Sequence, residues 1–61
     1  MYKVTRVFNS GRSVIVMTNV SLSDAQDWCN DPEHDSSTAV RSDAIRRTAK
    51  LGAWHDEYSA V

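Results

Sequence analysis

Several things are scarce in this 61-residue sequence, and each scarcity excludes a class of protein. The single cysteine, Cys29, cannot form an intramolecular disulfide, so this is not a disulfide-stapled secreted mini-protein and we expect a reducing cytosol. With one proline and two glycines, the chain contains no low-complexity linker. The longest apolar run, Val14 to Met17, is far shorter than the roughly 20 residues of a membrane-spanning helix. Residues 1–10 likewise lack an apolar run suited to a targeting segment, so we expect a soluble chain.

An excess of charge of one sign is also missing. The sequence has 8 acidic and 7 basic side chains, for a formal net charge of −1. Nucleic-acid binders usually carry a basic excess, so a nucleic-acid partner is not expected. The charged side chains nevertheless come in blocks. The acids and bases of residues 24–35 are all acids, whereas those of residues 41–50 are mostly bases. We expect one acidic and one basic surface, which either pair with each other or face a partner.

The length fits one small domain, residues 1–61. A chain of this size buries only about 60% of the surface that its unfolded form exposes, so its core is marginal. Such scaffolds normally need a metal, a disulfide or a partner chain, and a homo-oligomer would meet that need. A hydrophobic content of 41% with two tryptophans argues against disorder.

The first third of the chain predicts a β-hairpin. Residues 2–8 alternate, residues 13–18 are β-branched, and the turn-forming cluster Asn9-Ser10-Gly11-Arg12 lies between them. Alternation places Tyr2, Val4 and Phe8 on one face. An isolated hairpin is barely stable in water, so helices or a partner should cover one face.

A first short helix is predicted at about residues 22–30. Ser21 is its N-cap, with Asp24 three residues later, and Asp31-Pro32 ends it. The apolar stripe of this helix consists of Leu22, Ala25, Trp28 and Cys29.

A second short helix is predicted at about residues 43–51. We expect Ser42 as its cap, Gly52 just past its end, and a buried stripe formed by Ile45, Ala49 and Leu51. The sequence therefore predicts an α+β fold: an N-terminal β-hairpin followed by two short helices and an aromatic C-terminal tail. Trp54 should fold back onto the core.

The stretch DPEHDSST, residues 31–38, crowds acids, a histidine and hydroxyls between the two helices. Asp31, Glu33 and Asp35 have the early spacing of a calcium loop, but serines replace the required glycine and glutamate. The scattered Cys29, His34 and His55 do not match a zinc site. Cys29 with His34 lacks the further groups that a nucleophile and base require. We therefore predict no metal, no cofactor and no enzymatic activity.

The same stretch suggests an anion site as an alternative. The hydroxyls of Ser36, Ser37 and Thr38 precede a basic helix, and hydroxyls with guanidiniums can hold phosphate. The simpler interpretation is that these hydroxyls cap the chain's own backbone while the arginines are solvated. We favour that interpretation, in which residues 31–38 connect the helices.

A longer motif carries a resemblance. It consists of Ala25-Gln26, Cys29, Asp31-Pro32-Glu33 and Ser36 to Ala39, followed by Gly52, Trp54, Asp56 and Tyr58. This pattern resembles a group of small uncharacterised proteins of actinobacteriophages of the mycobacteriophage type, over about residues 21–58. In those proteins it reads roughly AQxHCxDPETSSxT and GPWFDxY. The chain departs from it at Trp28, at His34-Asp35, at Ala53 and at His55.

The resemblance implies a phage accessory protein made in the host cytoplasm, and such proteins often act by binding. Our leading hypothesis is a non-enzymatic protein that binds a host protein. The predicted partner-binding residues are Asp31, Glu33, Asp35, Arg41, Arg46 and Arg47. One alternative is a protein that sequesters a phosphorylated metabolite or a nucleotide on Ser36, Ser37, Thr38 and the arginines. A further alternative is a DNA-binding accessory protein, which the net charge disfavours.

Overall fold

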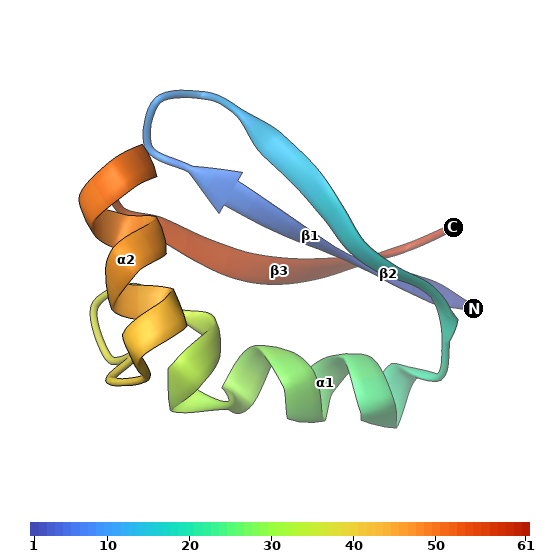
Figure 1. The fold of residues 1–61 in the computed structure, drawn as a ribbon. Coiled ribbons are helices and arrows are strands. Elements are labelled where there is room, and N and C mark those ends of the chain that lie inside the picture. The colour runs from blue at the N-terminus through green and yellow to red at the C-terminus, as the bar shows by residue number, and fades with distance from the viewer.

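The computed structural model describes residues 1–61 and has an α+β fold, as predicted. In chain order its elements are β1 (Tyr2–Phe8), β2 (Ser13–Val20), α1 (Leu22–Asn30), the short 3₁₀ helix η1 (Pro32–His34), α2 (Ser42–Leu51) and β3 (Trp54–Ala60). The strands form one antiparallel sheet in the order β2-β1-β3, and both helices lie on the same face of it (Figure 1). No helix is long and apolar enough to cross a membrane.

The predicted hairpin is confirmed, and β1 is its central strand. Gly11 takes a φ of 93° in the turn, a left-handed conformation that a side chain would disfavour. The turn is closed where the Phe8 amide donates to the Arg12 carbonyl at 2.8 Å. Val4 and Phe8 are both buried under the helices, which confirms that one face of the hairpin is covered.

The aromatic tail forms a third strand that we did not predict. β3 pairs with β1 along its whole length, from Phe8 opposite Trp54 to Tyr2 opposite Ala60. Trp54 packs in the core with only 2% of its surface exposed, as expected, whereas Tyr58 stays 40% exposed. The alternation of this strand is concealed in the sequence because its central inward position is a charged residue, Asp56.

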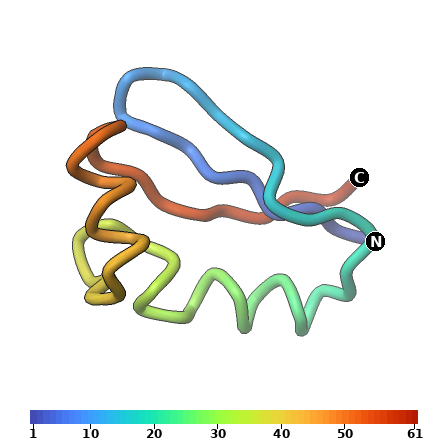
Figure 2. Tube along the Cα trace, in the orientation of Figure 1, coloured from blue at the N-terminus to red at the C-terminus, as the bar shows by residue number.

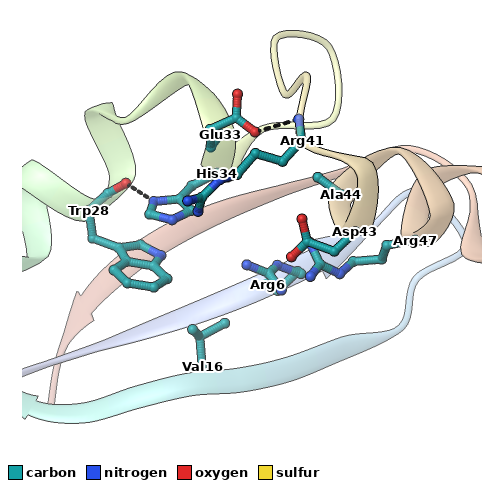
Figure 3. A pocket seen from close by; sticks show the side chains of 9 residues that line it. All are labelled: Arg6, Val16, Trp28, Glu33, His34, Arg41, Asp43, Ala44 and Arg47. Atoms are coloured by element: carbon teal, nitrogen blue, oxygen red, sulfur yellow. Dashed lines mark hydrogen bonds between the residues drawn. The ribbon is translucent and has the colours of Figure 1, made fainter.

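Irregular pairing in β2 changes which of its side chains face the helices. Ile15 lies opposite Thr5 but Met17 lies opposite Val4, so Val16 is an extra residue in the strand. Such a bulge lets neighbouring side chains turn toward the same face. Val16 points into the space between the sheet and the helices (Figure 3).

The first helix follows the prediction at both ends. The Ser21 hydroxyl accepts a hydrogen bond from the Asp24 amide at 3.2 Å, and the helix ends at Asn30, before Asp31-Pro32. Ala25 is fully buried and Trp28 and Cys29 are half-buried, whereas Leu22 is 41% exposed. The apolar stripe of α1 thus faces the sheet except at its first residue.

The second helix has the predicted extent but not the predicted cap or buried side. Its N-cap residue is Arg41 rather than Ser42, and the Arg41 side chain makes no capping hydrogen bond. The buried residue is Ala44, at 3% exposure, whereas Ile45 is 54% exposed. Ala44 packs with Phe8 and Trp54, because α2 meets only one end of the sheet and buries a narrow side. The remaining predicted stripe residues, Ala49 and Leu51, are exposed as well.

The helices leave part of the sheet uncovered. α1 packs against β1 and β3, and neither helix packs closely on β2, which arches away from them in the tube view (Figure 2). Gly52 ends α2 with a φ of 86°, as its predicted C-terminal position requires. Only 6 of the 61 residues are buried, so the fold depends on very few apolar contacts.

Candidate functional site

The acids of residues 31–38 hold the loop itself together. The Asp31 carboxylate accepts from the Glu33 amide at 2.9 Å. The Asp35 carboxylate accepts from both the amide and the hydroxyl of Ser37, at 2.9 and 2.7 Å. These two bonds favour the charged form and lower the pKa of Asp35 below its ordinary value.

Glu33 and the remaining hydroxyls tie this loop to α2 and β3. The Glu33 carboxylate accepts from the amides of Val40 and Arg41, at 3.0 and 2.9 Å, and so occupies the start of α2. Ser36 exchanges two bonds with the backbone of Trp54, and the Thr38 hydroxyl donates to a carbonyl of the loop. The structure therefore agrees with the connector interpretation of residues 31–38, and their carboxylates do not pair with the basic block.

A buried charge pair lies beneath the helices. The Arg6 guanidinium donates two hydrogen bonds to the Asp56 carboxylate, at 2.8 and 2.9 Å, and the Trp28 indole donates a third at 2.8 Å. The Asp56 side chain has no exposed surface. Strand pairing places Arg6 directly opposite Asp56, so the sheet register creates the pair and α1 seals it.

Trp54 organises the arginines next to this pair. Its indole donates to the Thr48 hydroxyl at 3.0 Å, which fixes the ring under α2. The guanidinium carbon of Arg6 lies 4.5 Å from the ring centre and that of Arg47 lies 4.9 Å from it. The Trp54 indole thus makes cation–π contacts with two guanidiniums, which are attracted to the face of an aromatic ring.

Arg6 and Arg47 form one wall of a cleft of about 260 Å³ between the sheet and the helices (Figure 3). Its other wall is a stacked pair, Trp28 and His34, whose rings are 3.8 Å apart and nearly parallel. The His34 ring is held by a 2.6 Å hydrogen bond to the Trp28 carbonyl. The lining residues are Arg6, Val16, Trp28, Glu33, His34, Arg41, Asp43, Ala44 and Arg47.

The cleft continues at both ends. Toward the hairpin turn it shares Arg6, Val16 and Arg47 with an apolar groove of about 290 Å³, which Phe8, Val14, Ile15 and Leu51 complete. Toward α1 it shares Trp28, His34 and Arg41 with a shallow depression, which Met17, Val20, Asp24, Asp27 and Asp31 complete. We call these three adjoining hollows the β2 trough, because all of them lie between β2 and the helices.

The predicted site residues are only partly brought together. Arg41, Arg47 and Glu33 line the central cleft, and Asp31 lines the depression beside it. Arg46 is exposed and lies outside the trough. Asp35 and the three hydroxyls of Ser36, Ser37 and Thr38 lie outside it as well.

Sequence reasoning missed Arg6 and Val16 as site residues, and it favoured a place in the core for Trp28 over a role as partner anchor. A signal existed for Arg6, because it falls between Val4 and Phe8 on the inward face of an alternating strand. A charged residue at such a position must find a partner when the strand is buried. No comparable signal identified Val16, whose placement depends on the irregular register of β2.

Cys29 is poorly suited to act as a nucleophile. Burial first, and then the carboxylates of Asp56 and Glu57, raise the pKa of its thiol above the ordinary value. A raised pKa keeps the thiol protonated at neutral pH, and the thiolate is the reactive form. No group of three or more histidine, cysteine, aspartate or glutamate side chains is arranged to hold a metal ion.

Comparison of the chain with protein families, with curated proteins and with solved structures found no match. The resemblance to actinobacteriophage proteins therefore stays a prediction from the sequence motif.

Proposed function

We propose that this chain is a non-enzymatic phage accessory protein that acts by binding, and that a protein of the bacterial host occupies the β2 trough. The observation that carries the proposal is the uncovered side of the sheet. α1 packs on β1 and β3, so the inward side chains of β2 face a hollow instead of a helix. In a domain with so small a core, apolar surface of this kind is expected to have a partner.

The lining of the trough supports a protein partner. Val14 and Leu51 offer apolar contact at one end, Arg6 and Arg47 lie in the middle, and acids line the other end. Aromatic and arginine side chains in partly desolvated pockets are the residues that most often anchor protein interfaces. Because acids interrupt the arginines, the trough gives no support to the DNA-binding alternative.

We further propose that copies of the chain associate through the free edge of β2. Ser13–Val20 contains no charged residue and no proline, whereas the other edge strand, β3, carries Asp56 and Glu57. Charges and prolines are what usually prevent edge strands from pairing with another chain. The β2 edge lacks both, and its pairing with β1 is regular over residues 13–15, before the bulge, so we expect the sheet to be extended along these residues.

Capture of a host protein from an actinobacterial lysate by the tagged chain, read by mass spectrometry, tests the host-protein proposal. We expect one host protein to be enriched by the wild type and lost with Leu51→Lys, which puts a charge at the apolar end of the trough. The matched control is Ile45→Lys, which changes a more exposed apolar residue on the same helix outside the trough. Equal capture by both variants, or no enriched protein, would contradict the proposal.

A further inference from the structure

The central cleft is lined by three arginines, and only one of them is paired with a carboxylate. The Arg6 guanidinium is matched by Asp56 in a bidentate pair. Arg41 and Arg47 have no carboxylate within ion-pair distance, since the only ion pairs in the structure are Arg6–Asp56 and His55–Glu57. Two guanidinium groups thus line one cleft without an acidic partner.

Both guanidiniums are directed at the cleft. Arg47 rests on the Trp54 ring, beside the fixed guanidinium of Arg6, which limits its freedom before any ligand arrives. The Arg41 side chain extends from the start of α2 toward His34 (Figure 3). A preorganised guanidinium loses less conformational entropy when it binds an anion than a freely moving one does.

Two acids also line the cleft, and they differ in what they do. The Glu33 carboxylate accepts hydrogen bonds from the amides of Val40 and Arg41, so it is already bound to the backbone at the start of α2. Asp43 makes no ion pair, and its carboxylate faces the cleft from the first turn of α2. Asp43 is therefore the one group that opposes an anion there.

We propose that this cleft binds the phosphate group of a small phosphate monoester, with Arg41 and Arg47 as its principal donors. A phosphate monoester carries a charge of about −1.5 to −2 at neutral pH and three acceptor oxygens, so it can bond to both unpaired guanidiniums at once, despite the opposing charge of Asp43. Guanidiniums also donate paired hydrogen bonds to phosphate oxygens. The adjoining apolar groove and the Trp28–His34 stack provide surface for the rest of the molecule. This proposal rests on a different observation from the host-protein proposal, the two unpaired guanidiniums, although the central cleft is part of the same trough. It moves the predicted anion site away from Ser36, Ser37 and Thr38.

Thermal melting and calorimetric titration of the intact chain test the proposal, with inorganic phosphate, adenosine monophosphate and adenosine as probes at constant ionic strength. We expect both phosphates, but not adenosine, to raise the melting temperature, because a ligand that binds only the folded state stabilises it. Tighter binding of the monophosphate than of inorganic phosphate would show that the cleft also contacts the remainder of the molecule. Binding of inorganic phosphate alone would contradict the monoester assignment.

The variants separate the site from general attraction by basic residues. Arg41→Gln should weaken monophosphate binding by roughly tenfold or more, because it removes a charge-assisted donor without touching the buried core. Arg46→Gln is the matched control, since it removes the same charge from the same helix outside the cleft. Asp43→Asn should strengthen binding. Equal loss with Arg41→Gln and Arg46→Gln, or no phosphate effect on the wild type, would overturn the proposal. Such a result leaves the host-protein proposal to its own test, the capture experiment with Leu51→Lys and Ile45→Lys.

Discussion

At the scale of single residues, the Asp56 carboxylate joins the sheet to the first helix. It accepts two bonds from Arg6 in the neighbouring strand and one from the Trp28 indole of α1. Burying a carboxylate is costly unless a cation and hydrogen-bond donors compensate its charge. Here both oxygens of Asp56 accept hydrogen bonds, and Arg6 supplies the opposite charge. The same burial makes the pair sensitive to the loss of either member.

Replacing Asp56 by asparagine should unfold much of the protein at room temperature. Removing one member of a buried ion pair costs about 3–5 kcal/mol, because the other charge stays buried without compensation. A domain this small is stabilised by only about 3–5 kcal/mol in total, so the loss is comparable with the whole. Circular dichroism during thermal melting measures the change. Asp27→Asn, which alters an exposed acid of α1, is the control, and equal melting temperatures for the two variants would show that the buried pair is dispensable.

At the scale of secondary-structure elements, the sequence correctly predicted the elements that are determined by contacts between neighbouring residues. The hairpin turn and α1 follow from short stretches such as Asn9 to Arg12 and Ser21 to Asp24, whose bonds lie within a few residues. The cap of α2 was predicted wrongly because its amides are satisfied by Glu33, which precedes the helix by a long stretch of loop. β3 was missed for a similar reason, since its pairing partner is at the other end of the chain.

The unusual cap of α2 yields a prediction about that helix. Glu33→Gln keeps the size of the side chain but removes the negative charge at the helix N-terminus, and an amide nitrogen replaces one accepting oxygen. We expect a loss of about 1 kcal/mol in the free energy of unfolding, the usual worth of a helix cap. Chemical denaturation measures it. Ser42→Ala should change stability by less than half as much, since its hydroxyl caps nothing, and a larger effect of Ser42→Ala would restore the original assignment.

At the scale of the whole molecule, the candidate site combines residues that the sequence keeps far apart. Arg41 and Arg47 were predicted from the charge of the second helix, and both line the central cleft. Arg6 and Val16 could not be added to them from the sequence, because their approach depends on strand order and on the bulge in β2. Composition indicated a marginal core, but only the three-dimensional arrangement shows that the uncovered part of the sheet is β2.

The open edge of β2 leads to the last prediction, which concerns association of the chain with itself. If copies pair through this edge, the melting temperature should rise with protein concentration, because mass action stabilises the associated folded state. Ile15→Lys should abolish that dependence, since Ile15 is an exposed residue of β2, paired with Thr5, and a charge on an edge strand opposes pairing. Ile45→Lys is again the control, because it adds the same charge on α2. Sedimentation of the wild type as a monomer at every concentration would exclude pairing, and β2 would then be free for the host protein alone.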